Sequence, residues 1–277
     1  MVPKPPRPAL NLRHPLARGL VGAWPFWTRE PNPGGNLLDR STGAGTTGSI
    51  SWAAGAPGAV LSCVGTNETD RCVVGGSLPA NPDTSTPKPF ALWALCKPAD
   101  TRASNKVYTV LSRCGGNYPG SAGLGGLLDW NGTYSLFSLI RRSYAGQYEG
   151  YTPIGSCPAG VWYSVVANCN ASGATIYVNG VAPAMAQYGA LNGGINVSAT
   201  MKWVVGGGEY EAGTYSYSFG GEIADARAWN RELTKAEADD LYVDPWGLYR
   251  RPHLPVRSSA TSFSPWLPTV LHRRQAR

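Results

Sequence analysis

Residues 162–181 have the sequence WYSVVANCNASGATIYVNGV, in which two runs rich in β-branched and aromatic residues flank Asn170 to Gly173. Such runs favour strands, and Asn, Ser and Gly between them favour a turn. The stretch therefore predicts a β-hairpin. A second hairpin is predicted at residues 127–139, LLDWNGTYSLFSL, because Asn131-Gly132 is typical of a type I′ turn between alternating segments.

Short apolar segments bounded by Gly, Pro, Asn or Ser recur along the chain and predict further strands. The predicted strands lie at about 58–64, 71–76, 89–97, 106–113, 124–130, 133–141, 161–169, 173–179, 201–206 and 220–229. Residues 19–27 predict a strand that Pro25 confines to an edge or a bulge, and residues 29–50 have loop composition throughout. Many short strands without a long helical period predict an all-β sandwich or barrel.

One short helix is predicted near the C-terminus, within LTKAEADDLYVDP at residues 233–245. Thr234 is followed three residues later by Glu237, which is the pattern of a capping box. Leu241 and Tyr242 complete one apolar face, and Pro245 ends the helix. We expect this helix to cover an edge of the sandwich.

The two ends of the chain are basic. The formal net charge is +7, yet residues 1–19 and 245–277 hold four and six basic residues and no acid, so the segment between them is mildly acidic. Both ends also carry prolines and large apolar residues. We predict an extended arm at 1–19, a globule at 20–243 and an extended arm at 244–277. The arms would dock to an acidic partner surface or across subunits of a homo-oligomer, although solvated tails remain an alternative.

The predicted docking residues are Arg7, Arg13, Arg18, Trp246, Leu248, Tyr249, Arg250, Arg251, Trp266, Leu267, Arg273 and Arg274. Nothing in either arm has the pattern of a nucleic-acid motif.

Several function classes are disfavoured by the composition. The N-terminus lacks the apolar run of a secretion signal, and no segment is long and apolar enough to span a membrane, so we expect synthesis in the cytosol without membrane association. The histidines, His14, His253 and His272, all lie in the arms, which excludes a Ser-His or Cys-His triad within the globule and argues against zinc. Of the six cysteines, Cys63 and Cys72 flank the turn-forming TNETD, which would place them opposite each other in a hairpin; under oxidising conditions they form a candidate disulfide.

The chain resembles a known family over roughly residues 20–243. GLVGAWPFWTREP, GAVLSCVGTNETDRCVV, PFALWALCKP, GVWYSVVANCNASGATIYVNGV and FGGEIADARAWNRELTKAEADDLY are similar to successive strands of concanavalin A-like, laminin-G-like domains. The resemblance implies a jelly-roll sandwich with one short C-terminal helix. The ends, NLRHPLARGLVG and DPWGLYRRP, resemble virion-associated proteins of tailed bacteriophages.

The resemblance raises two candidate chemistries, hydrolysis and calcium binding. Glycoside hydrolysis needs a carboxylate pair, but Glu222 and Asp225 are three residues apart and would face opposite sides of a strand, whereas Asp225 and Arg227 share a face that suits an ion pair. The family often binds Ca²⁺ at the sandwich rim, and Asp39 and Asp225 match two acids of that pattern. We expect no required cofactor and leave Ca²⁺ open.

Exposed aromatic residues beside polar loops suit the stacking of sugar rings, although they also suit ordinary packing on a sheet. The candidate glycan-binding residues are Trp130, Tyr134, Tyr144, Tyr148, Tyr151, Tyr210, Tyr215 and Tyr217.

The sequence thus yields three hypotheses of function. The first is a non-enzymatic virion accessory protein, a capsid decoration or tail-associated protein that docks through its arms to capsid or tail proteins and displays a lectin-like sandwich towards host-surface glycans. The second is a free glycan-binding module, for which the arms would be dispensable. The third is a divergent glycoside hydrolase that depends on Glu222 or Asp225.

Overall fold

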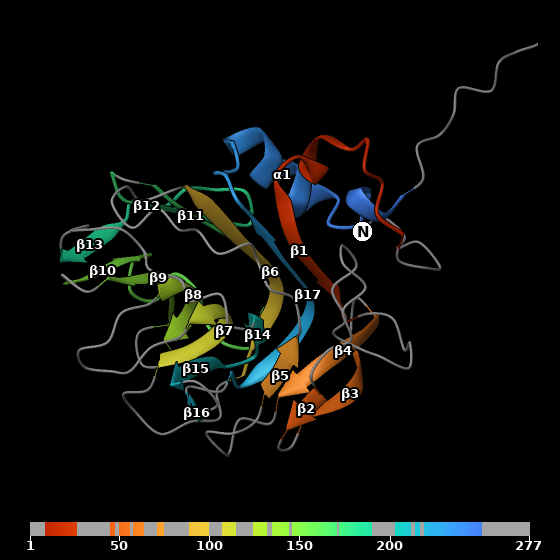
Figure 1. The fold of residues 1–277 in the computed structure, drawn as a ribbon, viewed down its shortest axis with the longest axis horizontal. Coiled ribbons are helices and arrows are strands. Elements are labelled where there is room, and N and C mark those ends of the chain that lie inside the picture. The colour runs from red at the N-terminus through yellow and green to blue at the C-terminus, as the bar shows by residue number, and fades with distance from the viewer. Residues whose placement is uncertain are drawn as a thin grey trace, which may run out of the picture.

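A computed structural model describes most of the chain. The described residues are 9–26, 45–47, 50–55, 58–63, 71–74, 89–99, 107–114, 124–131, 135–143, 146–170, 172–189, 203–211, 214–216 and 219–250. Within them, two antiparallel sheets form a β-sandwich with one α-helix (Figure 1). The predicted all-β sandwich is confirmed.

The first sheet, here called sheet A, contains the strands nearest both ends of the chain. Its order is β12-β11-β6-β17-β4-β3, and β1 pairs with β17 beyond the end of β4. The strands are β1 (Leu20–Pro25), β3 (Ile50–Gly55), β4 (Gly58–Cys63), β6 (Phe90–Pro98), β11 (Tyr163–Cys169), β12 (Ala174–Val178) and β17 (Gly221–Trp229). As predicted, β1 lies at an edge; its irregularity falls between Leu20 and Gly22 rather than at Pro25, which pairs in register with Asp225.

The second sheet, sheet B, has the order β13-β10-β9-β8-β7-β14-β5-β2. Its strands are β2 (Gly45–Thr47), β5 (Arg71–Val74), β7 (Val107–Cys114), β8 (Leu124–Asn131), β9 (Leu136–Ser143), β10 (Gly146–Tyr151), β13 (Ala186–Gly189) and β14 (Trp203–Val205). A separate two-stranded ribbon is formed by β15 (Gly208–Glu211) and β16 (Thr214–Ser216).

The main core lies between the two sheets, where alternate side chains of each strand meet. Sheet A contributes Trp24, Leu92 and Ile223, and sheet B contributes Phe137 and Val205, all with no more than 1% of their surface exposed. Burial of each such side chain stabilises the fold by about 1.5–3 kcal/mol. This core fixes which face of each strand points outward.

Both predicted hairpins exist, but one has a different turn. Cys169 pairs with Ala174, so the connection is Asn170 to Gly173 as predicted, and Asn170 Oδ1 accepts hydrogen bonds from the N–H groups of Ser172 and Gly173 at 2.6 and 3.1 Å. In the β8–β9 hairpin, Asn131 pairs with Leu136. The two-residue Asn131-Gly132 turn is therefore wrong, because β8 continues through Asn131 and the connection is longer.

The predicted hairpin around TNETD is also wrong. Cys63 lies in β4 of sheet A, in register with Ile50 and Gly221, whereas Cys72 lies in β5 of sheet B, in register with Val205. The connection between β4 and β5 crosses from one sheet to the other, because each strand pairs with a partner that is distant in sequence. The geometric basis of the proposed Cys63–Cys72 disulfide, two opposed residues of one hairpin, is absent.

Several short strands fall where no strand was predicted. β2 and the start of β3 lie within residues 29–50, which were expected to be loop, and β10, β13, β15 and β16 were not predicted as elements. These strands are short and contain Gly, Ser, Thr or Ala, so their own composition gives little strand signal; β2, β3, β10 and β13 pair within the two sheets, whereas β15 and β16 pair with each other.

The helix α1 (Lys235–Val243) has the predicted capping box. Glu237 N–H donates to Thr234 Oγ1 at 3.2 Å, and Thr234 N–H donates to Glu237 Oε2 at 2.9 Å. Its buried residues are Ala238 and Leu241, whereas Tyr242 is half exposed, so the predicted Leu241–Tyr242 face is wrong. The helix covers the outer face of sheet A rather than an edge, because Ala238 and Leu241 pack with residues of β6, β11 and β17.

Short terminal segments also pack on this outer face. We call residues 9–19 the N-terminal strap and residues 244–250 the C-terminal strap; Asn11 N–H donates to Leu248 O at 2.8 Å, and the two straps lie side by side near α1 (Figure 1). Leu16, Trp246, Leu248 and Tyr249 are at most 1% exposed. The prediction of extended arms is therefore wrong for residues 9–19 and 244–250, which belong to the folded domain.

No helix within the described part of the chain is long and apolar enough to cross a membrane.

Candidate functional site

A row of polar residues crosses the outer face of sheet B. Ser138 in β9 pairs with Tyr151 in β10 and with Asp129 in β8, and Asp129 pairs in turn with Thr109 in β7. Phe137 and Leu139 on either side of Ser138 point into the core between the sheets. Because neighbouring residues of a strand point to opposite faces, the side chain of Ser138 lies on the outer face, and the backbone pairing aligns the positions of Thr109, Asp129 and Tyr151 with it. We call these four positions the polar row.

The polar row is enclosed rather than freely solvated. Thr109 and Ser138 are each 1% exposed, and Tyr151 is half-buried. The hydroxyl of Ser138 is buried without a hydrogen-bond partner. A buried hydroxyl that lacks a partner costs about 1–3 kcal/mol, so its retention calls for an explanation such as a ligand or a bound water molecule.

The residue types of the polar row suit the binding of a ligand that carries hydroxyl groups. Hydroxyl groups can donate and accept hydrogen bonds, and the half-buried ring of Tyr151 at the end of the row offers an apolar face with a polar tip. Of the residues predicted to bind glycans, Tyr151 is the one whose side chain the structure describes. Ser138 and Thr109 were missed, and their position in a buried row could not be recognised without the strand pairing.

The other predicted glycan-binding aromatics are not brought together with Tyr151 by the described pairings. Trp130 is in register with Phe137, Tyr148 with Arg141, and Tyr215 with Glu209, while Tyr210 lies in β15. Tyr134, Tyr144 and Tyr217 lie outside the described residues.

The outer face of sheet A carries a second set of polar groups near the start of β17. Glu222 pairs in register with Lys97 of β6, and their side chains form an ion pair at 2.9 Å. The ammonium group of Lys97 also lies 5.7 Å from the centre of the Trp162 ring. Glu222 therefore has a counter-ion in place, which does not favour a role as a catalytic acid.

A β-bulge changes the predicted relation between Glu222 and Asp225. The pairing of β17 with β6 is irregular between Ile223 and Asp225. Ile223 points into the main core, but Ala224 packs with Trp246 on the outer face, and Asp225 bonds to Tyr249 there. The prediction that Glu222 and Asp225 face opposite sides is thus wrong, because the bulge inserts one extra residue between them.

Asp225 and Arg227 form the predicted ion pair, and the pair is fully buried. Arg227 Nη2 lies 2.6 Å from Asp225 Oδ2, and both side chains are 0% exposed. The guanidinium lies between two aromatic rings, 4.3 Å from the centre of Trp93 and 4.6 Å from the centre of Tyr249. This stacking gives the buried cation favourable contact with the electron-rich ring faces.

The ion pair also holds the C-terminal strap. Tyr249 donates its hydroxyl to Asp225 Oδ1 at 3.0 Å and accepts from Arg227 Nε at 3.2 Å, and Arg227 Nη2 donates to Pro245 O. Burial raises the pKa of Tyr249 well above its usual value, so the phenol stays protonated. Burial also raises the pKa of Asp225 to about 6, although Arg227 and Tyr249 lower it.

Asp225 does not fit the role of a calcium ligand. Its carboxylate is fully buried and already bonded by Arg227 and Tyr249, whereas Ca²⁺ requires six to eight oxygen ligands. Among the described residues, no group of three or more His, Cys, Asp and Glu is placed to hold a metal ion. Asp39 lies outside the described residues.

The predicted docking residues fall into three groups. Trp246, Leu248 and Tyr249 are buried in the domain, so their predicted role in docking to a partner is wrong. Arg13 and Arg18 are exposed on the N-terminal strap, and Arg250 forms an ion pair with Asp244 at 2.9 Å. Arg7, Arg251, Trp266, Leu267, Arg273 and Arg274 lie outside the described residues.

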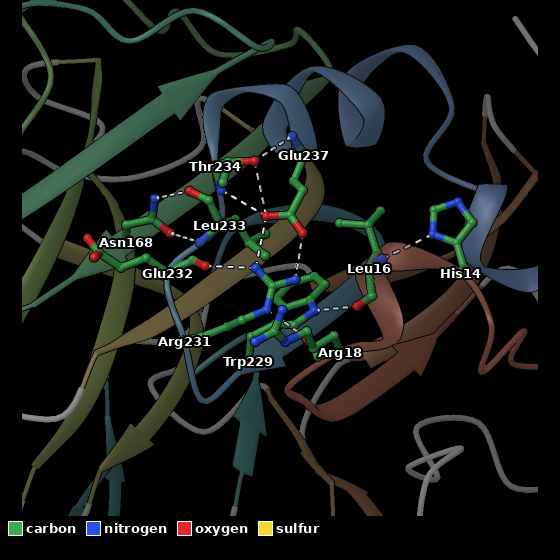
Figure 2. A network of polar contacts seen from close by, with 10 residues as sticks. All are labelled: His14, Leu16, Arg18, Asn168, Trp229, Arg231, Glu232, Leu233, Thr234 and Glu237. Carbon is green, nitrogen blue, oxygen red and sulfur yellow. Dashed lines mark hydrogen bonds and ion pairs between the residues drawn. The ribbon is translucent and has the colours of Figure 1, made fainter.

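Arg231 joins the N-terminal strap to α1 (Figure 2). Its guanidinium donates to both carboxylate oxygens of Glu237, at 2.6 and 2.8 Å, and to the backbone oxygen of Arg18 at 2.8 Å. Although burial alone would raise it, the pKa of Glu237 is lowered by the hydrogen bonds from Arg231 and Thr234. Both carboxylate oxygens of Glu237 therefore accept hydrogen bonds, and the contact ties the N-terminal strap to α1.

Further hydrogen bonds of this network hold the N-terminal strap against sheet A. The indole N–H of Trp229 donates to Leu16 O at 2.7 Å, and Leu16 N–H donates to His14 Nδ1 at 3.2 Å (Figure 2). Burial lowers the pKa of His14, which keeps its imidazole neutral and able to accept this bond. Asn168 forms two hydrogen bonds with the backbone of Leu233. Its Nδ2 donates to Leu233 O at 2.8 Å, and its Oδ1 accepts from Leu233 N–H at 3.0 Å.

Comparison with protein families agrees with this architecture. Residues 75–239 match the family model Laminin_G_3, described as the concanavalin A-like lectin/glucanases superfamily. This match covers more than half of the chain, which therefore belongs to that family. No curated protein sequence matches the chain.

Among solved structures, the binding domain of Paraclostridial Mosquitocidal Protein 1 is similar, with a TM-score of 0.58 and 11% identity, over 82% of this chain and 52% of that one. The binding domain of botulinum neurotoxin DC, in complex with rat synaptotagmin II, has a TM-score of 0.56 and 9% identity over the same fractions. The present chain thus spans about half the length of these toxin domains.

Domain 4 of AbnA, a GH43 extracellular arabinanase from Geobacillus stearothermophilus in complex with arabinotriose, has a TM-score of 0.51 and 18% identity, over 80% of this chain and 98% of that domain. At these identities the three similarities concern the fold alone.

Proposed function

We propose that this chain is a non-enzymatic, lectin-like protein that binds glycans through the outer face of sheet B. The observation that carries the proposal is the buried hydroxyl of Ser138, which lacks a partner in the middle of the polar row. A sugar hydroxyl could supply the missing hydrogen bond while the ring packs on Tyr151. The arabinotriose complex of the similar AbnA domain supports the same class of ligand.

The charges on sheet A support a binding role rather than hydrolysis. A retaining or inverting glycosidase needs one protonated and one ionised carboxyl group flanking the substrate. Glu222 is paired with Lys97, and Asp225 is buried against Arg227. Each carboxylate is thus paired with a cation of its own sheet, which favours a structural role for both.

The test is to probe a glycan array with the full-length protein and to assay every bound glycan for release of reducing sugar. The proposal expects binding to at least one class of glycan and no hydrolysis. Absence of binding across the array would contradict it, and hydrolysis that is abolished by Glu222→Gln would favour the hydrolase instead.

A second role, as a virion accessory protein, is favoured by the placement of the two ends. Residues 9 and 250 both belong to straps on the outer face of sheet A, opposite the polar row. The residues beyond them, 1–8 and 251–277, are basic and hold no acid. Attachment through this side would leave sheet B directed away from the carrier.

Co-sedimentation with virions stripped of accessory proteins tests this second role. The full-length protein should pellet, and a variant with Arg251, Arg257, Arg273, Arg274 and Arg277 changed to Gln should pellet less. A truncation to residues 20–243 is unsuitable, since it removes Leu16, Trp246, Leu248 and Tyr249 from the packed outer face. If the wild type stays in solution, the virion role is contradicted.

A further inference from the structure

A hollow of about 800 Å³ lies between the N-terminal strap and the start of α1. Leu12, Arg13 and Arg18 line it from the strap, and Arg231, Thr234 and Glu237 line it from the opposite side. Its lining includes no residue of the polar row of sheet B.

The polar groups on the α1 side of the hollow are already satisfied. Glu237 is bonded by Arg231 and by Thr234 N–H, and Thr234 Oγ1 accepts from Glu237 N–H. The N-terminus of α1 is thus capped by its own residues and offers no separate site for an anion.

The strap side presents two guanidinium groups, those of Arg13 and Arg18. The backbone of each is fixed: Arg13 N–H donates to Asn11 Oδ1 at 3.1 Å, and Arg18 O accepts from Arg231 Nε at 2.8 Å. Both residues are exposed, and among the described residues neither guanidinium has an ion-pair partner. Since burial keeps His14 neutral, these two guanidiniums set the charge of the hollow.

An apolar contact point lies beside these cations. Leu12 is 72% exposed, the largest exposed fraction among the large hydrophobic residues of the described chain. A ligand that covers it must present an apolar group next to negative charge. Acidic peptide segments combine both features, whereas a sulfated glycan offers charge without an apolar side chain.

We propose that this hollow docks an acidic, leucine-containing segment of a carrier protein, with carboxylates on Arg13 and Arg18 and an apolar side chain on Leu12. The proposal rests on the second proposed role, attachment to a carrier, and names the chemistry of the partner. Docking here leaves the polar row on the opposite sheet free.

The experiment measures binding of a fluorescein-labelled peptide of alternating glutamate and leucine to the full-length protein by fluorescence anisotropy. Arg13→Gln together with Arg18→Gln should weaken binding by about tenfold or more. The matched control, Lys235→Gln together with Arg250→Gln, removes the same charge from two cations that are already paired and should change binding less than about twofold. Leu12→Ser should weaken binding by about threefold or more, and high salt should weaken it further.

Three results would overturn the proposal. The first is no binding of the peptide, and the second is an equal loss of binding in the two double variants. The third is unchanged peptide binding by Leu12→Ser together with binding of a heparin fragment that is stronger than binding of the peptide. All four residues that are changed to Gln are partly or fully exposed, so thermal unfolding should show that both double variants fold. Glycan binding by Arg13→Gln/Arg18→Gln is measured in parallel. Its retention without any peptide binding would reject the hollow and leave the proposed glycan function standing.

Discussion

The outer face of sheet A is covered by the chain itself, whereas the outer face of sheet B carries a polar row. On sheet A, the straps and α1 bury Leu16, Trp246 and Leu248, and a buried ion pair is closed by Tyr249. On sheet B, Thr109 and Ser138 are buried among strands, and the Ser138 hydroxyl lacks a partner.

We interpret this difference as a division of roles: the polar groups on sheet A support the fold, and the polar row on sheet B is the proposed binding site. The hydrogen bonds of the Asp225–Arg227–Tyr249 set hold the C-terminal strap through Tyr249 and Pro245, although Arg227 Nη1 is buried without a partner. An unsatisfied buried group such as the Ser138 hydroxyl costs stability in the free protein, and a ligand or a bound water molecule would supply the missing hydrogen bond. The following predictions test that contrast.

Replacement of Arg227 by Ala should have the largest effect. It leaves the Asp225 carboxylate buried without its cation and removes the stacking between Trp93 and Tyr249, which should cost about 3–5 kcal/mol of unfolding free energy. Urea denaturation measures this loss. Lys235→Ala, which breaks an exposed pair with Asp239, serves as the control and should cost less than about 0.5 kcal/mol. Similar losses in both variants would show that the buried pair is not special.

One leucine from each strap provides a matched pair for comparing burial. Leu248 is 0% exposed and Leu12 is 72% exposed. Leu248→Ala should destabilise the domain by about 3 kcal/mol through lost burial and a cavity, whereas Leu12→Ala should be nearly neutral. Denaturation midpoints of the two variants compare them directly, and a neutral Leu248→Ala would mean that the C-terminal strap is not part of the stable domain.

Two buried serines of sheet B should respond in opposite directions. Ser112 donates its hydroxyl to Gly207 O at 2.9 Å, whereas the Ser138 hydroxyl has no partner. Ser112→Ala should therefore lose about 1 kcal/mol, and Ser138→Ala should gain about 1 kcal/mol in the absence of ligand. Thermal unfolding of both variants is the measurement. Destabilisation by Ser138→Ala would indicate that its hydroxyl is bonded in solution and would weaken the case for the polar row.

Stability should also depend on pH through Asp225. Because the pKa of Asp225 is raised to about 6 in the folded protein, the folded state binds a proton more tightly than the unfolded state. The stability contributed by this group therefore increases as the pH falls from about 6 towards the ordinary value of 3.8, by up to about 1 kcal/mol per pH unit, and does not change with pH above or below this window. Comparison of unfolding between pH 7 and pH 5 in the wild type and in Asp225→Asn isolates this contribution, which the variant should lack. A pH dependence that is identical in both would contradict it.

The sequence predicts the strands well where their local pattern is strong. The β11–β12 hairpin, β17 and the capping box of α1 follow from β-branched runs, turn residues and the Thr234–Glu237 spacing. Pairing between distant strands is not encoded in such local patterns. For this reason the bulge at Ala224, which brings Glu222 and Asp225 to one face, and the crossing of β4 and β5 to opposite sheets could not be predicted.

The straps show a second limit of local patterns. Their prolines indicate extended chain, and extended chain can pack on a face as well as leave it. The apolar residues Leu16, Trp246 and Leu248 were a usable signal, since large apolar side chains need cover, but composition alone does not say whether a partner or the chain itself supplies that cover. The polar row was missed for a related reason, because Ser138 and Thr109 acquire meaning only from their alignment across three strands.

The most direct test of a glycan site on sheet B compares two half-buried aromatic residues, Tyr151 in the polar row and Trp162, which precedes β11 of sheet A and lies beside Lys97. Isothermal titration with the strongest glycan from the array would measure the affinity of the wild type, Tyr151→Ala and Trp162→Ala. We expect a loss of about tenfold for Tyr151→Ala, equivalent to about 1.4 kcal/mol, and little change for Trp162→Ala. Unchanged affinity in Tyr151→Ala, or a loss confined to Trp162→Ala, would contradict the placement of the glycan site on sheet B.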